Sequence, residues 1–474
     1  MSTFGFINRE NELSALEKAY HSPTSAFVVI YGRRRVGKTA LIRNFLQDKK
    51  ALYFLATQEA DHLNRRSFQE HLTHLLPLPY LESAENLSWQ LMFEEIARHS
   101  KQERIIIALD EFQYLGMADP SFPSLFQKIW DTTLKESNLM VIICGSLLSL
   151  MESQALNYNS PLYGRRTAQI RLDPLDFRHY RGFYPDHLSP ADLLWRYGAT
   201  GGVPRYIEAL RATDDGEELN SFWQAVQSEF LNPSALLYEE PYFLLSREVK
   251  DLGSYFSLLK TIAAGNHRLG KIATYMSIKE MNLRHHLKTL IDLGMIKKLV
   301  PVTEKQPEKS KLSLYMIADE FLRFWFRFIY PNKSYLEIEQ TEPILQKIKE
   351  RYLEDHLSYV YETVCLQDLI YRTPREMPDW QLNRFGKWWN RNEEIDLVAL
   401  SEEHNLIAFG ECKMTGKPVG SDLLHSLRLK ATKVNWGKAN RQEKFFLYSY
   451  SGFTSKLEQL AANDEQVKLL TLTW

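Results

Sequence analysis

The run GRRRVGKT at residues 32–39 constrains this chain more than any other feature, because it fits the pattern GxxxxGK[ST]. The apolar segment AFVVIY precedes it, and a helix-forming segment begins at Ala40. Glycines let the backbone N–H groups of such a loop wrap around phosphate oxygens, and the positive end of the following helix favours the anion. A strand, a loop and a helix in this order predict a phosphate-binding loop in an α/β domain.

We expect the ligand of this loop to be ATP. Lys38 can reach the β- and γ-phosphates, and the Thr39 hydroxyl can be a ligand of Mg²⁺. The expected nucleotide-binding residues are Gly32, Arg33, Arg34, Arg35, Val36, Gly37, Lys38, Thr39 and Ala40.

Acidic and polar residues at two later strand ends complete this site. Asp110 and Glu111 directly follow the apolar run IIIAL. We expect Asp110 to hold Mg²⁺ through water, and Glu111 to polarise the water that attacks the terminal phosphate. A later run, LMVIIC, ends near Ser146, which either senses the γ-phosphate or lies in a simple turn. The sequence therefore predicts an ATP hydrolase.

Short apolar runs separated by helical stretches continue to about residue 175. They lie at residues 26–31, 51–56, 104–109, 139–144 and, more weakly, 168–172. Buried runs of this kind indicate a parallel sheet covered by helices on both faces. A helical stretch follows, and after residue 255 the pattern changes to three short helices and two strands, which describes a winged helix.

Two arginines, Arg165 and Arg166, come just before the fifth strand in the run PLYGRRT. An arginine finger that acts on the nucleotide of a neighbouring subunit would lie at this position in a homo-oligomer. The alternative is that both are ordinary surface arginines.

The motifs YGRRRVGKT, LDEFQ, CGS, PLYGRRT and GGVPRYI, in this order, resemble the archaeal-type ATPase family within the AAA+ and STAND class of P-loop NTPases. The resemblance implies a five-stranded core of the ASCE type at residues 1–175, a helical lid at 176–250 and a winged helix at 251–330. In this class a GxP motif lies near the adenine, so the resemblance assigns Pro204 to nucleotide binding. The segment FINRENEL at residues 6–13 resembles the one that precedes the P-loop near the adenine.

The expected winged helix is basic. Ten Lys or Arg and four acidic residues lie between Arg268 and Lys311, a local balance of +6. Such a surface suits contacts to the phosphates of DNA. Winged helices also serve as protein-binding or lid modules, so DNA and a protein partner both remain open.

The C-terminal part carries a second constellation. Asp396 lies in the strand-like run EIDLVAL, and Glu411 and Lys413 end the run FGECK. Residues i and i+2 of a strand point to the same side, so two hairpin-linked strands can bring the three side chains together. Two carboxylates can hold Mg²⁺ or Mn²⁺ while the lysine orients water, and Glu362 on the preceding helix could add a fourth group.

This arrangement resembles the PD-(D/E)xK nuclease superfamily. The resemblance implies a restriction-endonuclease-like α/β domain at residues 331–474, with Asp396, Glu411 and Lys413 as catalytic residues. The chain departs from the usual motif at Ile395, where proline often stands. A nuclease fold that does not cleave remains an alternative.

Composition bounds the remaining possibilities. The chain has 474 residues, too many for one core, and its formal net charge is −1, so any nucleic-acid surface must be local. Three distant cysteines without a CxxC pair predict neither disulfides nor a zinc site. No signal pattern and no apolar run near the ~20 residues of a membrane span are present, so we expect a cytoplasmic protein without a membrane partner.

Two functions fit these features. The first is an ATPase that binds DNA through a winged helix and cleaves it with the C-terminal domain. The second is a nucleotide-controlled switch whose C-terminal domain binds nucleic acid or protein without cleaving.

Overall fold

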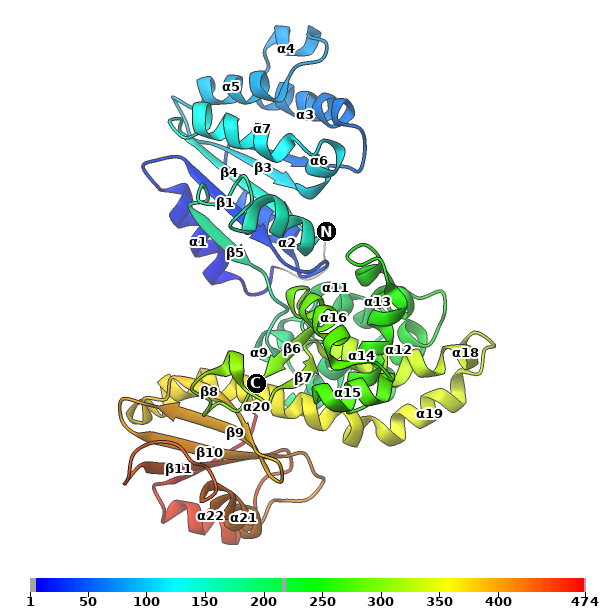
Figure 1. The fold of residues 1–474 in the computed structure, drawn as a ribbon, viewed down its shortest axis with the longest axis vertical. Helices are drawn as coiled ribbons and strands as arrows, with labels where there is room; N and C mark the ends of the chain where they lie inside the picture. The colour runs from blue at the N-terminus through cyan, green and yellow to red at the C-terminus, as the bar shows by residue number, and fades with distance from the viewer. Residues whose placement is uncertain (1–5, 215–218, 473–474) are drawn as a thin grey trace. The chain divides into compact units, whose positions relative to one another are not determined.

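The computed structural model describes residues 6–214 and 219–472, which form two compact units (Figure 1). Unit 1 contains the described residues up to Pro174, with Val203–Arg205 and Leu244–Lys250. Unit 2 contains Leu175–Gly202, Tyr206–Phe243 and the described residues from Asp251.

Unit 1 is built on a parallel five-stranded sheet, as predicted. The strands are β1 Ala26–Tyr31, β2 Ala51–Leu55, β3 Ile105–Asp110, β4 Leu139–Gly145 and β5 Ala168–Arg171. Their order is β2-β3-β4-β1-β5, and every neighbouring pair is parallel. All carboxyl ends therefore meet at one edge, where the loop after β1 and the acidic residues that end β3 come together.

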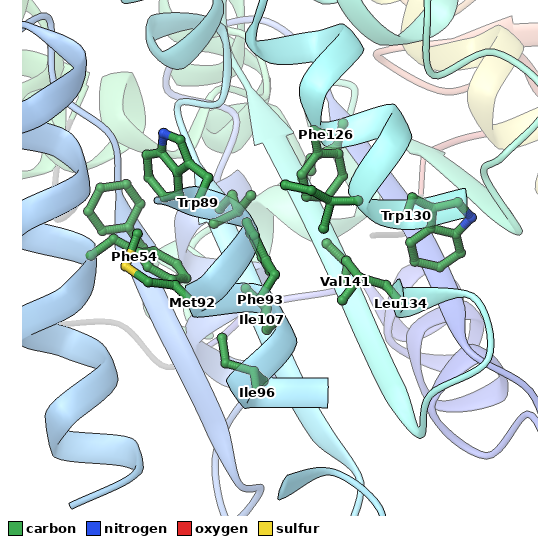
Figure 2. Close-up of a cluster of buried hydrophobic side chains, with 14 of the residues drawn as sticks. Phe54, Trp89, Met92, Phe93, Ile96, Ile107, Phe126, Trp130, Leu134 and Val141 are labelled. Carbon is green, nitrogen blue, oxygen red and sulfur yellow. The ribbon is translucent and has the colours of Figure 1, made fainter. Parts of the chain in front are cut away.

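Helices cover both faces of this sheet, which explains why β1, β3 and β4 are almost continuously apolar. One face packs aromatic side chains such as Trp89, Phe93 and Phe126 (Figure 2). The opposite face packs Leu16 and Ile42. The helices of unit 1 are α1 Glu10–Tyr20, α2 Lys38–Phe45, α3 Asp61–Leu75, α4 Pro79–Ser83, α5 Trp89–His99, α6 Gln113–Ala118, α7 Phe122–Ile129 and α8 Leu148–Met151, with π-helical turns at Trp130–Leu134 and Glu152–Leu156.

Unit 2 begins with helices. They are α9 Phe177–Tyr180, α10 Pro190–Thr200, α11 Pro204–Arg211, α12 Leu219–Phe230 and α13 Leu236–Ser246. A capping box formed by Ser189 and Asp192 starts α10. The first residues of α11 and the last residues of α13 belong to unit 1.

Three helices and a hairpin follow: α14 Leu252–Ala263, α15 Leu269–Met276, α16 Glu280–Asp292, β6 Ile296–Leu299 and β7 Leu314–Ile317. The two strands pair in antiparallel fashion. Helix α16 buries Leu283, Leu287 and Leu290 along one side, which follows the helical period of its apolar residues.

The last part of unit 2 is a mixed sheet in the order β12-β11-β10-β9-β8. Its strands are β8 Arg384–Trp389, β9 Glu394–Ser401, β10 Leu406–Lys413, β11 Gln442–Ser449 and β12 Val467–Leu470. Strands β10, β11 and β12 are parallel, whereas β9 runs antiparallel to both of its neighbours. The helices of this part are α17 Glu320–Phe324, α18 Lys333–Leu336, α19 Thr341–Tyr352, α20 Ser358–Glu376, α21 Ser421–Ala431 and α22 Ser455–Ala462, with π-helical turns at Trp325–Ile329 and Leu353–Leu357.

Within the described ranges, no helix is both long enough and apolar enough to cross a bilayer.

Candidate functional site

The backbone of the loop between β1 and α2 is shaped for close approach. Gly32 has φ 152°, and a Cβ atom added there would lie 2.3 Å from the Leu172 carbonyl oxygen. Gly37 has φ 97° and precedes the first residue of α2. Glycine is therefore required at position 32 and favoured at position 37, and the N-terminal N–H groups of α2 face the loop as an anion-binding end.

Lys38 is held inside this loop. Its side chain is only 7% exposed, and Nζ donates to the carbonyl oxygens of Gly32 (2.9 Å) and Arg33 (2.8 Å). Burial lowers the pKa of Lys38, while the carboxylates of Glu111 and Asp110 act in the opposite direction. An ammonium group whose partners are neutral carbonyls can exchange them for phosphate oxygens, which are stronger acceptors.

Thr39 and Asp110, which the sequence predicts to bind Mg²⁺, lie side by side. The Thr39 hydroxyl donates to Asp110 Oδ2 at 2.8 Å, and Asp110 is only 2% exposed. Tyr53 donates to the same oxygen at 2.8 Å, and burial raises the pKa of Tyr53, so its hydroxyl remains a donor. Hydroxyl and carboxylate oxygens at this spacing fit Mg²⁺, which prefers oxygen ligands and keeps several waters.

Glu111 lies beside Ser146. The Ser146 hydroxyl lies 2.8 Å from Glu111 Oε2 and 3.1 Å from Oε1, and the Gln113 amide also donates to this carboxylate. Glu111 has φ 53°, a left-handed conformation that costs a non-glycine residue roughly 1–2 kcal/mol. Two neutral donors thus hold the carboxylate that sequence reasoning assigned to water activation. Gln113 was missed, although it lies two residues after Glu111.

Two further predicted segments reach the loop. Arg9, in the FINRENEL segment, donates to the carbonyl oxygens of Asp173 (2.7 Å) and Val36 (3.2 Å). Pro204 lies beside Gly37, because a Cβ atom added to that glycine would be 3.9 Å from the proline Cγ.

Arg165 and Arg166 lie elsewhere on unit 1. They precede β5, which runs parallel to β1, so they lie at the amino edge of the sheet while the phosphate loop lies at the carboxyl edge. Arg165 makes a two-point ion pair with Asp131 (3.0 and 2.8 Å), and Arg166 donates to the carbonyl of Leu156 (3.2 Å). Neither arginine is brought together with Lys38 in one chain.

The C-terminal sheet gathers the second predicted set. Asp396 Oδ2 accepts the backbone N–H of Cys412 at 3.0 Å, which fixes the carboxylate on β9 against β10. Glu411, 2% exposed, pairs with Lys413 through Oε2 (3.2 Å) and with Lys430 through Oε1 (2.6 Å). Burial raises the pKa of Glu411, and the negative charge of Asp396 raises it further.

Glu362 on α20 lies in the same electrostatic environment. It forms an ion pair with Lys387 of β8. Burial raises the pKa of Glu362; Lys387 opposes this shift, and the charge of Asp396 adds to it. Lys387 and Lys430 were both missed from the sequence, because one lies in the unrecognised strand β8 and the other on α21.

The C-terminal carboxylates fit a cation only in a limited way. In residues 6–214 and 219–472, no group of three or more His, Cys, Asp or Glu side chains is arranged to hold a metal ion. Mg²⁺ is often held by one or two carboxylates and completes its shell with water, so Asp396 and Glu411 are the residues that would hold it.

Comparison with known proteins agrees with the first site. A family described as an ATPase domain predominantly from Archaea matches residues 6–210, and a family of archaeal and bacterial proteins of unknown function matches residues 325–422. An uncharacterised protein of Methanocaldococcus jannaschii is 35% identical over 408 residues, which are 86% of this chain and 87% of that protein. The chain belongs to this family of archaeal-type ATPases.

Two further similarities concern a short segment and the fold. An uncharacterised ATP-binding protein of Methanocaldococcus jannaschii is 49% identical over 45 residues, 10% of this chain and 76% of that one. The solved Walker-type ATPase of Pyrococcus abyssi has a TM-score of 0.52 at 21% identity, covering 68% of this chain and 96% of that chain, which shows a shared fold. The protein thus carries a P-loop ATPase domain of the archaeal type at residues 6–210.

Proposed function

We propose that the protein hydrolyses Mg-ATP with Lys38, Thr39, Asp110 and Glu111. The observation that supports this most is that neutral donors hold Glu111 beside Ser146 while Lys38 rests on loop carbonyls. On ATP binding, the Lys38 ammonium moves its hydrogen bonds to phosphate oxygens, and Glu111 accepts the proton of the attacking water. Thr39 and Asp110 would hold Mg²⁺, which when bound neutralises part of the charge on the phosphates.

The test separates binding from chemistry. Glu111→Gln should keep the affinity for ATP within about threefold and lower hydrolysis by about 10²–10⁴-fold, the range of general-base catalysis. Ser146→Ala, which removes one of the donors that hold Glu111, should have a smaller effect on hydrolysis. Unchanged hydrolysis in Glu111→Gln would exclude this residue as the base.

As a second candidate function, we propose that residues 331–474 form a PD-(D/E)xK-like domain that hydrolyses phosphodiester bonds. Its support is the grouping of Asp396, Glu411 and Lys413 at adjacent strand ends. Lys413 would hold the attacking water or a phosphate oxygen beside the two carboxylates, and Glu362 would contribute negative charge. Mg²⁺ or Mn²⁺, when bound, would stabilise the charge that develops on the phosphate.

Cleavage of supercoiled DNA with Mg²⁺ or Mn²⁺ tests this second function. Wild type should nick the plasmid, and Asp396→Ala and Lys413→Ala should not. Lys38→Ala in the same assay shows whether ATP controls cleavage. If wild type cleaves nothing, the C-terminal domain is a binding module, and the alternative of a nucleotide-controlled switch replaces the nuclease.

We also propose that α14–α16 with β6 and β7 form a winged helix that contacts DNA. The support is the exposed side of α16, where Arg284, His285 and Lys288 lie opposite the buried leucines. Arg284→Glu combined with Lys288→Glu should weaken binding to duplex DNA. The slope of log K against log salt concentration should become less steep by about one for each lost phosphate contact. Lys456→Glu, an exposed position on α22, is the control. Equal binding by all variants would favour a protein partner.

Completion of the ATP site by a neighbouring subunit remains a prediction for Arg165 and Arg166. If it holds, hydrolysis per chain should rise with protein concentration, and Arg165→Ala should remove that rise. A monomer that hydrolyses ATP as fast as any assembly would contradict it.

A further inference from the structure

The hydroxyl of Tyr114 has two arginine partners in unit 1. Arg34 of the phosphate loop donates to it through Nη2 (3.2 Å), and Arg247 donates through Nη1 (3.1 Å). Tyr114 lies three residues after Glu111, at the start of α6. Two guanidinium groups from distant parts of the sequence therefore meet next to the residues that handle the terminal phosphate.

The neighbour of Arg247 fixes its position. Glu248 accepts hydrogen bonds from the backbone N–H of Leu148 (3.0 Å) and from the Ser149 hydroxyl (2.7 Å). Leu148 begins α8, two residues after Ser146. The segment Leu244–Lys250 is thus held at the carboxyl edge of the sheet, where β1, β3 and β4 deliver Lys38, Glu111 and Ser146.

A neutral hydroxyl is a weak partner for two guanidinium groups. Hydrogen bonds from arginine to phosphate or carboxylate are roughly twice as strong as those between neutral groups, and the planar guanidinium matches paired phosphate oxygens. Among the described residues no carboxylate forms an ion pair with Arg34 or Arg247, and Arg247 is exposed. Both groups are therefore available to a phosphate that reaches the loop.

We propose that Arg247, together with Arg34, contacts the terminal phosphate of ATP and is a catalytic residue of the hydrolysis reaction. Water attacks the γ-phosphorus, its proton passes to Glu111, and the bond from the γ-phosphorus to the bridging oxygen breaks. ADP leaves with that electron pair, and phosphate is released. Arg247 stabilises the negative charge on the γ-phosphoryl oxygens, as an arginine supplied by the same chain.

This inference rests on the proposed ATP hydrolysis and extends it to nucleotide sensing. Arg247 directly follows α13, whose earlier residues Leu236–Phe243 belong to unit 2. An arginine that binds ATP but loses its ligand when phosphate departs would report the nucleotide state to the end of that helix.

The decisive variant is Arg247→Ala, with Lys250→Ala in the same segment as a matched control. Wild type and Lys250→Ala should hydrolyse ATP equally, and Arg247→Ala should lose about 10²-fold or more in kcat. Its Kd for ADP should stay within about twofold of wild type, which shows that the site is folded. Its affinity for ADP with aluminium fluoride, which imitates the transferred phosphoryl group, should fall by at least about tenfold.

Tyr114→Phe separates a direct role from a structural one. If Arg247 acts on phosphate, removing its resting partner should leave kcat within about threefold of wild type. If Tyr114→Phe reproduces the loss in Arg247→Ala, the arginine only positions Tyr114, and the inference is overturned. Added guanidinium should restore part of the activity of Arg247→Ala. If activity is not restored and ADP binding is also weaker than in wild type, the inference is likewise overturned.

The two possible failures are distinguishable. If wild type hydrolyses no ATP, the proposed function itself fails. If wild type hydrolyses ATP and Arg247→Ala does so at the same rate and binds ADP–aluminium fluoride equally well, only the role of Arg247 fails.

Discussion

The phosphate loop of unit 1 and the acidic cluster of the C-terminal sheet both combine lysine with carboxylates, but they connect them differently. In the loop, Lys38 donates to carbonyl oxygens, and Glu111 is held by neutral donors. In the cluster, Lys413 and Lys430 both pair with the Glu411 carboxylate. Lys38 is therefore available to an anion. Lys413 and Lys430, in contrast, already neutralise the negative charge of Glu411 that would attract a cation.

Replacing Lys38 or Lys413 with alanine should show this difference most strongly. Lys38→Ala removes the ammonium that would bind the terminal phosphates and should lower ATP hydrolysis by about 10²–10³-fold, as loss of one charge-stabilising donor does elsewhere. Lys413→Ala should leave hydrolysis unchanged. A phosphate-release assay on both variants checks this, and an equal loss in both would mean that the two sites act as one.

Acid should affect unit 2 through a buried histidine. His356 Nε2 lies 2.7 Å from the Gly198 carbonyl oxygen, and burial, with the nearby charge of Arg323, lowers its pKa to about 3 from 6.5. As the pH falls below 6.5, His356 therefore takes up a proton in the unfolded chain while it stays neutral in the folded one. The free energy of unfolding decreases as the pH falls. The loss from pH 7 to pH 5 should be about 2 kcal/mol.

Urea unfolding at pH 7 and pH 5 measures this effect. His356→Gln keeps a donor for Gly198 but does not titrate, so its stability should fall by about 2 kcal/mol less than that of wild type over this interval. His267, whose pKa burial lowers to about 4, remains in both proteins and acts in the same direction. Equal losses in wild type and His356→Gln would contradict the assignment.

The cluster should respond to removal of its own lysine. Lys430→Met takes a competing positive charge from Glu411 and should tighten Mn²⁺ binding by up to about fivefold, because a partly exposed ion pair contributes up to about 1 kcal/mol. Because burial raises the pKa of Glu411, protons should compete with Mn²⁺ at a higher pH than at an ordinary carboxylate, so affinity falls as the pH falls. Mn²⁺ titration followed by electron paramagnetic resonance measures both.

Lys433→Met is the matched control for Lys430→Met, because Lys433 pairs with Glu393 outside the cluster. It should leave Mn²⁺ binding unchanged. Weaker Mn²⁺ binding in Lys430→Met would mean that this lysine organises Glu411 and does not compete with the cation.

The same contrast explains what could be predicted from the sequence. A phosphate loop is made of consecutive residues and backbone groups, so Gly32, Lys38 and Thr39 identify it without a structure. Asp110 and Glu111 follow because an apolar run ends in them, and the five-stranded parallel sheet follows from the apolar runs.

Residues brought together by tertiary packing could not be found in this way. Lys387 lies in β8, where the run RFGKWW has no regular alternation of apolar and polar residues. Lys430 is a half-buried residue near the end of α21 and belongs to no motif. Arg247 lies in no motif at all; its hydrogen bond to Tyr114 and those of its neighbour Glu248 to Leu148 and Ser149 bring it near the phosphate loop. Side-chain pairs between distant elements leave no local spacing to recognise.

The smallest expected effect concerns the neutral donor Tyr53. Tyr53→Phe removes one hydrogen bond from Asp110, so the carboxylate becomes a better acceptor for the water shell of Mg²⁺. The Mg²⁺ concentration that half-saturates hydrolysis should fall by about twofold, which corresponds to about 0.5 kcal/mol, the lower end of the contribution of a neutral hydrogen bond. Tyr20→Phe is the control. A larger change of metal binding in Tyr53→Phe than in Lys430→Met would contradict the contrast between the two sites. It would mean that the neutral hydroxyl restrains its carboxylate more strongly than the lysine ammonium restrains Glu411.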